Sequence, residues 1–148
     1  RLTFSTSAKP HNLPFQHTEF IGREVEKKQL AKKLQESTCR LLTIVGPGGM
    51  GKTRLAMACA GERLEAFRDG VCFVSFAAVT APDLMVYAVA DALELKLLGQ
   101  RPPKEQVLEY LKNKKMLLVL DNLEHLLSGI DFLNEILATA TEIKILAT

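Results

Sequence analysis

Short apolar runs alternate with segments of helical spacing along most of the chain. Four runs rich in β-branched or leucine residues predict buried strands, at 40–45, 71–76, 116–120 and 143–147. Apolar positions that recur every three or four residues predict helices, at 23–36, 52–67, 80–95, 104–112 and 128–140. Strands separated by helices predict an α/β fold whose parallel sheet is covered on both faces.

Helix-start signals precede two of these helical segments. Thr80 and Asp83, with Pro82 between them, predict a capping-box-like start for one helix. Ser128 and Asp131 predict the same for another.

The first eighteen residues show neither period. They are polar and contain Pro10 and Pro14, which predicts a linker, 1–18, that crosses the surface of a domain formed by 19–148. The chain begins with Arg1 and stops at Thr148, directly after an apolar run without a turn signal. We therefore expect a piece of a longer protein, with a truncated core.

Composition narrows the class of protein. Hydrophobic residues make up 47% and charged residues 24% of the chain, which is typical of a soluble globular domain. The 19 Lys and Arg against 17 Asp and Glu give a net charge of +2, so no cationic nucleic-acid arm is indicated. The apolar runs are too short to cross a membrane and no signal peptide opens the chain, which favours a cytoplasmic protein. Three cysteines without a CxxC pair argue against a disulfide scaffold and a zinc site.

A glycine-rich loop carries the strongest chemical signal. It satisfies the P-loop pattern GxxxxGK[ST] between a predicted strand and a predicted helix. Its glycines permit a tight curl of backbone N–H groups, and the following helix adds its positive end, so the loop is suited to phosphate. Lys52 is expected to reach the β- and γ-phosphates and Thr53 to bind Mg²⁺. The predicted nucleotide-binding residues here are Gly46, Pro47, Gly48, Gly49, Met50, Gly51, Lys52, Thr53 and Arg54.

A carboxylate follows the third predicted strand. Asp121 ends the run MLLVLD, at the carboxyl end of a buried strand where ligands of parallel sheets gather. Such an aspartate is also a common turn or cap residue, but together with the P-loop it predicts a Walker B metal ligand. We therefore expect Thr53 and Asp121 to hold Mg²⁺.

The residue that would activate water is less clearly marked. Asn122, an amide, follows Asp121, so the nearest acid is Glu124. Glu124 is a candidate general base, and its alternative role is that of an acid favoured in the first turn of a helix. His125 is either near the γ-phosphate or structural.

Several segments together resemble a known family. FIGREVEKKQLAKKL, GPGGMGKTRLAMACA, FRDGVCFVSFAAV, LLVLDNLEHLL and IKILAT occur in the order and spacing of the signal-transduction ATPases with numerous domains (STAND; AP-ATPase or NB-ARC-like). The chain is most similar to the bacterial predicted-ATPase branch found in large transcriptional regulators. The resemblance covers about residues 12 to 148.

This resemblance implies a fold, a ligand and a role. It implies a three-layer P-loop NTPase of the ASCE/AAA+ type with four strands in the order 2-3-4-1, and contacts of Ile21, Gly22 and Arg23 with the base side of ATP or ADP. It also implies a switch that is closed with ADP and assembles or exposes an output domain with ATP, so its partners are domains of the same chain or other copies. The family's fifth strand, helical lid and sensor arginine are absent from 1–148. We therefore expect weak binding and slow hydrolysis by this chain alone, and an exposed edge on the first strand.

Two alternative functions stay open on the sequence. A P-loop kinase for a small molecule would need a lid arginine, for which Arg101 is the one candidate, and would place the Walker B strand directly beside the P-loop strand. An interaction module with a vestigial nucleotide site is compatible with Asn122 and with the missing sensor arginine. The absence of an NKxD motif favours ATP over GTP.

Overall fold

A parallel sheet forms the centre of the molecule. The computed structural model describes residues 10–13, 24–46 and 51–148. Its four strands are β1 (Leu41–Thr43), β2 (Val71–Ser75), β3 (Met116–Asp121) and β4 (Ile143–Ala147). They are all parallel and lie in the order β1-β4-β3-β2. The order 2-3-4-1 is thus confirmed, with β4 inserted between β1 and β3.

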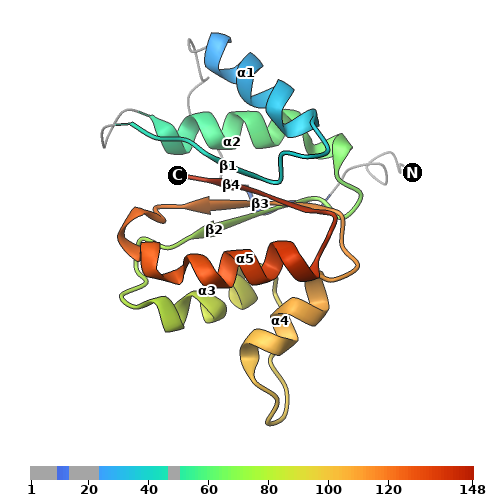
Figure 1. Ribbon diagram of the computed structural model, residues 1–148, viewed down its shortest axis with the longest axis vertical. Helices are drawn as coiled ribbons and strands as arrows, with labels where there is room; N and C mark the ends of the chain where they lie inside the picture. Colours follow the sequence, from blue (N-terminus) through green and yellow to red (C-terminus); the bar gives the residue numbers. More distant parts are fainter. Residues whose placement is uncertain (1–9, 14–23, 47–50) are drawn as a thin grey trace, which may run out of the picture.

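Helices cover both faces of this sheet (Figure 1). One face carries α1 (Glu24–Gln35) and α2 (Lys52–Glu62), which pack against each other. The other face carries α3 (Met85–Ala92), α4 (Pro103–Leu111) and α5 (Ile130–Thr139). The three-layer α/β fold expected from the alternating pattern is therefore present.

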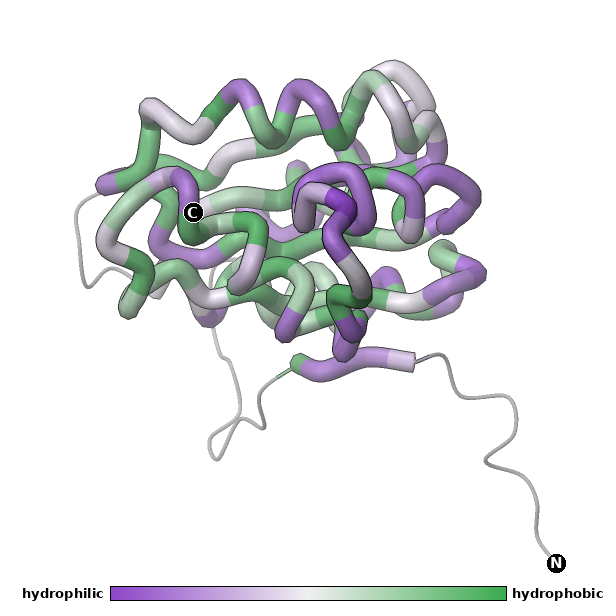
Figure 2. Tube along the Cα trace, turned by 90° about the horizontal axis from the view of Figure 1, so that it is seen from below, coloured by the Kyte–Doolittle hydropathy of each residue, from purple (hydrophilic) through white to green (hydrophobic). Residues whose placement is uncertain are grey.

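The central strand β3 shows how one run of apolar residues serves two cores. Successive side chains of a strand point to opposite faces. Leu117 and Val119 accordingly belong to the core beneath α1 and α2, whereas Leu118 and Leu120 belong to the larger core beneath α3 and α5. All four are fully buried. In Figure 2 hydrophobic residues are frequent on the inner segments of the trace and hydrophilic residues on the outer ones.

The helix starts differ from the predicted caps. A 3-10 turn, Pro82–Leu84, precedes α3, and a longer 3-10 segment, Glu124–Gly129, precedes α5. The N-cap residues are Leu84 and Gly129, and neither makes a side-chain capping bond, so the two predicted capping boxes are wrong. Thr80 and Ser128, the predicted caps, lie upstream of the helices, because 3-10 segments precede α3 and α5. The second predicted helix also ends early, at Glu62, and a 3-10 turn, Leu64–Ala66, follows.

The described part of the predicted linker lies along the outer edge of β2. His11 forms a parallel bridge with Val71, whose N–H donates to the carbonyl of Pro10 at 3.1 Å. The side-chain amide of Asn12 donates to the carbonyl of Phe73 at 2.9 Å and accepts from the N–H of the same residue. We call residues 10–13 the edge strap.

Gly70 makes this close approach possible. Its φ is +91°, and a Cβ there would lie 1.9 Å from the carbonyl oxygen of Pro10. Only glycine fits such a position without displacing the strap.

The opposite edge of the sheet is different. Among the described residues, β1 pairs with β4 alone, so its outer side has no strand beside it. Val45, just after β1, is 83% exposed. No helix within 10–13, 24–46 and 51–148 has the length and apolar character needed to cross a membrane.

Candidate nucleotide site

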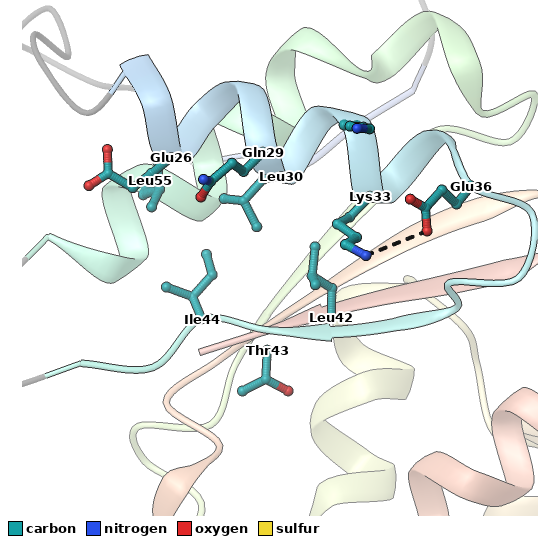
Figure 3. A pocket seen from close by; sticks show the side chains of 10 residues that line it. Glu26, Gln29, Leu30, Lys33, Glu36, Leu42, Thr43, Ile44 and Leu55 are labelled. Carbon is teal, nitrogen blue, oxygen red and sulfur yellow. Dashed lines mark ion pairs between the residues drawn. The ribbon is translucent and has the colours of Figure 1, made fainter.

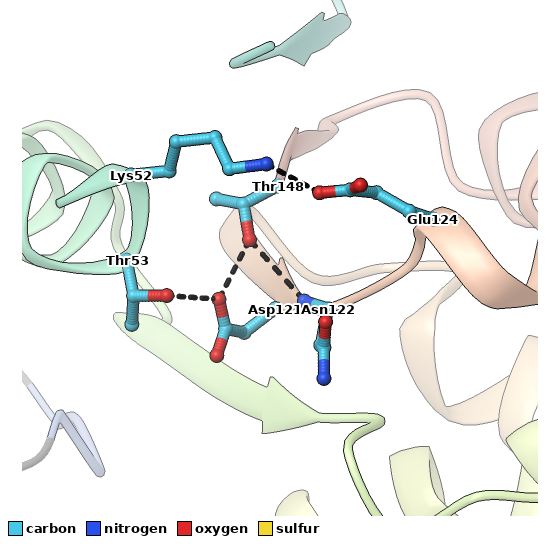
Figure 4. Close-up of polar contacts among 6 residues, drawn as sticks. All are labelled: Lys52, Thr53, Asp121, Asn122, Glu124 and Thr148. Atoms are coloured by element: carbon cyan, nitrogen blue, oxygen red, sulfur yellow. Dashed lines mark hydrogen bonds and ion pairs between the residues drawn. The ribbon is translucent and has the colours of Figure 1, made fainter. Parts of the chain in front are cut away.

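The carboxyl ends of β3 and β4 meet the start of α2 at one edge of the sheet. In open α/β folds this edge is where ligands bind. Six polar residues from these elements and from the 3-10 segment after β3 converge there (Figure 4): Lys52, Thr53, Asp121, Asn122, Glu124 and Thr148.

The first turn of α2 has no side-chain cap. Its N-cap, Gly51, adopts the left-handed conformation with φ 77° and ψ 20°, and glycine offers no side-chain acceptor to cap the helix. The N–H groups of a first helical turn have no partner within the helix, and the helix dipole adds positive potential there. An anion such as a phosphate group is the natural partner of this end.

Asp121 lies against Thr53. The hydroxyl of Thr53 donates to Oδ1 of Asp121 at 2.6 Å, although the two residues are far apart in sequence. The pairing exists because β3 ends beside the start of α2. A hydroxyl and a carboxylate are hard oxygen ligands of the kind that Mg²⁺ prefers. The two residues predicted to bind the metal are therefore together, and their chemistry fits it.

Thr148 completes this cluster, and the sequence interpretation missed it. Its hydroxyl donates to the same Oδ1 of Asp121 at 2.6 Å and accepts from the N–H of Asn122 at 3.2 Å. Thr148 is only 4% exposed. A usable signal was present, because Thr148 directly follows an apolar run and the carboxyl ends of adjacent parallel strands meet at one edge.

Glu124 lies over the P-loop lysine. Nζ of Lys52 forms an ion pair with Oε1 of Glu124. The lysine side chain is 11% exposed and the glutamate side chain 64% exposed. Asn122 directs the chain to this position, because its φ of 64° turns the backbone out of β3 toward Glu124. Asparagine adopts this left-handed conformation more readily than most residues.

His125 has a structural contact. Its Nε2 lies 2.9 Å from the carbonyl oxygen of Val79, on the loop after β2. The structural alternative for His125 therefore holds.

Two cavities flank the open edge of β1. One, of about 380 Å³, lies between β1 and the segment 123–133; it is mostly apolar and reaches Lys52, Glu124 and Thr148. The other, of about 500 Å³, lies between α1 and β1, with Leu30, Leu42 and Ile44 on its walls (Figure 3). Only the first adjoins the polar cluster.

Some predicted site residues cannot be placed. Ile21, Gly22, Arg23, Pro47, Gly48, Gly49 and Met50 lie outside the described residues. Arg54 lies half-buried on α2, one residue after Thr53.

No group of three His, Cys, Asp or Glu residues suited to a metal occurs within the described ranges. Arg101 is paired with Glu109 at 2.6 Å and is 55% exposed, so it is an ordinary surface residue.

Comparison with known proteins identifies relatives of the sequence. Residues 34–146 match a family model described as "AAA domain". A candidate HTH-type transcriptional regulator of Mycobacterium bovis is 40% identical over 110 residues, which are 74% of this chain and 12% of that protein. An uncharacterized protein of Mycobacterium tuberculosis is 30% identical over 132 residues, 88% of this chain and 33% of that protein. The chain thus spans about an eighth to a third of the length of these relatives.

Solved structures share the fold at low sequence identity. The ORC2 protein of Aeropyrum pernix, in ADPNP–ADP complexes, superimposes with a TM-score of 0.64 and 16% identity over 87% of this chain and 41% of that one. The Cdc6 protein of Pyrobaculum aerophilum gives a TM-score of 0.60 and 21% identity over 97% and 41%. At these identities the likeness concerns the fold alone.

Proposed function

Because the chain belongs to the AAA domain family, we propose that it binds ATP or ADP with Mg²⁺ at the carboxyl ends of β3 and β4. The contact that carries the proposal is the 2.6 Å hydrogen bond between Thr53 and Asp121. It unites the P-loop helix with the acidic end of β3, so one metal ion can reach ligands from both.

Each part of the site has a separate task. The loop residues Gly46, Pro47, Gly48, Gly49, Met50 and Gly51 and the first turn of α2, including Arg54, surround the phosphates. Lys52 contributes a positive charge to them, and Thr53 and Asp121 hold the metal. Ile21, Gly22 and Arg23 contact the base, as the STAND resemblance implies.

Glu124 has two successive partners in this proposal. It holds the ammonium group of Lys52 in the nucleotide-free chain. When nucleotide occupies the loop, its phosphates take over the lysine and the exposed carboxylate becomes free to accept a proton from water. When bound, Mg²⁺ would neutralise part of the negative charge of the phosphates.

Calorimetric titration tests the binding proposal. ATP, ADP and GTP are titrated with and without Mg²⁺ into the chain, into Lys52→Ala and into Lys104→Ala. Lys104 is a matched control, since it forms an exposed pair with Glu135 at 2.9 Å, remote from the P-loop. We expect adenine nucleotides to bind the chain and Lys104→Ala alike, and Lys52→Ala to lose at least about tenfold in affinity. Equal affinity of Lys52→Ala and the unaltered chain would refute the site.

We further propose that the nucleotide site is a switch within a multidomain regulator of the STAND class. The motifs of the sequence and the name of the 40% identical relative support this role. Its partners are then other domains of the same protein and further copies of it. The test is sedimentation of the full-length protein with ADP and with a non-hydrolysable ATP analogue. A change of compactness or assembly is expected, and identical sedimentation argues against a switch.

The strand order disfavours the kinase alternative. In that alternative the Walker B strand lies directly beside the P-loop strand, whereas β4 separates β1 from β3 here. An interaction module with a vestigial nucleotide site is the remaining alternative. Binding of adenine nucleotide that Lys52→Ala weakens would argue against it, and absence of binding would support it.

A further inference from the structure

A second cavity with the chemistry of a binding site lies at the other end of the sheet. It has a volume of about 390 Å³ and adjoins the starts of β1, β3 and β4, away from the nucleotide site at their carboxyl ends. Four cations from four segments line it: Arg40, Arg63, Lys115 and Lys144. We call this cavity the basic pocket.

The basic pocket has an excess of positive charge. Glu142 is the single carboxylate on its wall. Within 10–13, 24–46 and 51–148, none of the four cations forms a salt bridge. This contrasts with Lys104 and Arg101, whose side chains face solvent and pair with acids. Four cations beside one carboxylate repel one another unless a further anion joins them.

Two of the cations are fixed by helix ends. The guanidinium of Arg40 donates to the carbonyl of Leu137 at 2.9 Å, in the last turn of α5, and to those of Ala140 at 2.5 Å and Ile143 at 3.1 Å, beyond the helix. The ammonium of Lys144 donates to the carbonyl of Glu36 at 2.7 Å, beyond the end of α1. These bonds hold both groups rigidly in the wall, so their charge is positioned before any ligand arrives.

The third cation carries an unused donor. Nε of Arg63, at the end of α2, is buried, and no hydrogen-bond acceptor meets it in the described part of the chain. This atom is covered by the protein, so an anion in the cavity would respond to the charge of the Arg63 guanidinium. Burial is the main cause that lowers the pKa of Lys144; the nearby Arg63 and Arg40 also lower it, while Cys39 and Glu36 raise it.

We propose that the basic pocket binds a small oxyanion, a phosphate or carboxylate group, that is held by the charges of Arg63, Lys115 and Lys144. Lys115 is exposed and lines the cavity, so its ammonium group is available to a ligand. The cavity volume of about 390 Å³ is sufficient for a phosphate group together with bound water molecules. This function is separate from nucleotide binding, because it uses no residue of the P-loop cluster.

NMR titration tests the proposal directly. Inorganic phosphate is titrated into ¹⁵N-labelled Lys52→Ala chain, in which the P-loop no longer competes, and the backbone amide signals of Arg63, Phe67 and Lys144 are followed. Acetate is titrated separately. Tighter binding of phosphate indicates a phosphate-bearing ligand, and equal binding indicates the carboxylate of an acidic side chain.

Two variants distinguish the pocket from general attraction of anions. Arg63→Gln keeps most of the side chain's length and removes the charge, and it should weaken saturable binding by about tenfold to a hundredfold. Arg68→Gln is the matched control, since Arg68 is exposed, pairs with Asp69 and lies outside the pocket; it should bind as before. If Arg63→Gln does not fold, the titration of the Lys52→Ala chain with intact Arg63 still tests whether the pocket binds an anion. Absence of saturable shifts with both anions, or unchanged binding in Arg63→Gln, overturns the proposal.

Discussion

The hydroxyl of Thr53 lies 2.6 Å from a carboxylate oxygen of Asp121, so the start of α2 and the end of β3 share one hydrogen bond. Thr148 donates to the same oxygen at the same distance. The acidic group is therefore oriented by hydroxyls from two elements before any ligand is present.

Asp121→Asn should separate metal binding from folding. The amide keeps an oxygen that both hydroxyls can reach, so the chain should remain folded. It loses the negative charge, and the Mg²⁺-dependent part of nucleotide affinity should fall by at least about tenfold. Calorimetry with and without Mg²⁺ measures this difference. An unchanged Mg²⁺ dependence would show that Asp121 does not serve the metal.

Glu124→Gln should affect binding and turnover in opposite directions. The variant releases Lys52 from its ion pair, so nucleotide should bind equally well or up to about fivefold tighter, since such pairs with an exposed member contribute little. If Glu124 is the general base, steady-state hydrolysis by the full-length protein should fall by about a hundredfold or more.

A control is available away from the nucleotide site. Glu135→Gln removes an exposed carboxylate of α5, paired with Lys104, and should change neither quantity. Full turnover of Glu124→Gln would assign the base to another residue.

Asn12→Ala should release the edge strap. The substitution removes the two hydrogen bonds with the backbone of Phe73, and the free energy of unfolding should fall by about 1 kcal/mol. Urea denaturation measures the change, and faster hydrogen exchange at the Phe73 amide locates it. Asn134→Ala, at an exposed position of α5, is the matched control and should lie within about 0.5 kcal/mol of the parent. Unaltered exchange at Phe73 would mean that the strap is not docked in solution.

The buried cysteines should be unreactive and should make stability depend on alkaline pH. Burial raises the pKa of Cys59 to about 11 and that of Cys72 to about 12. Thiolate is the reactive form, so both should resist a thiol reagent at pH 8 that modifies the half-buried Cys39. Because the folded chain retains these protons longer than the unfolded chain, stability should fall as pH rises from about 9 through these values. Labelling of Cys59 or Cys72 as fast as Cys39 would contradict the burial.

The sequence pattern predicted the framework well, for a physical reason. Apolar runs such as 116–120 are buried on both faces of the sheet, and a continuous apolar run of this length is typical of a strand in a parallel sheet. Thr53 and Asp121 were predicted as a pair because a P-loop and an acidic strand end have fixed places in a parallel sheet.

Residues whose role depends on distant contacts were not predicted. The side-chain amide of Asn12 forms hydrogen bonds with the backbone of Phe73, which is far away in the sequence. Neither the helical nor the strand period of hydrophobic residues predicts such a contact. The caps at Thr80 and Ser128 were predicted from local preference and proved wrong, because 3-10 turns held by the tertiary packing intervene before α3 and α5. The basic pocket likewise was not predicted, because its cations, Arg40, Arg63, Lys115 and Lys144, are far apart along the chain.

The edge strap leaves the two edges of the sheet in different states. At the outer side of β2, the carbonyl of Pro10 and the side-chain amide of Asn12 already occupy hydrogen-bonding groups of Val71 and Phe73. The outer side of β1 has no strand beside it among the described residues. A further strand, from this protein or another copy, would have to displace the strap at β2, whereas at β1 it meets no described segment that it would have to displace.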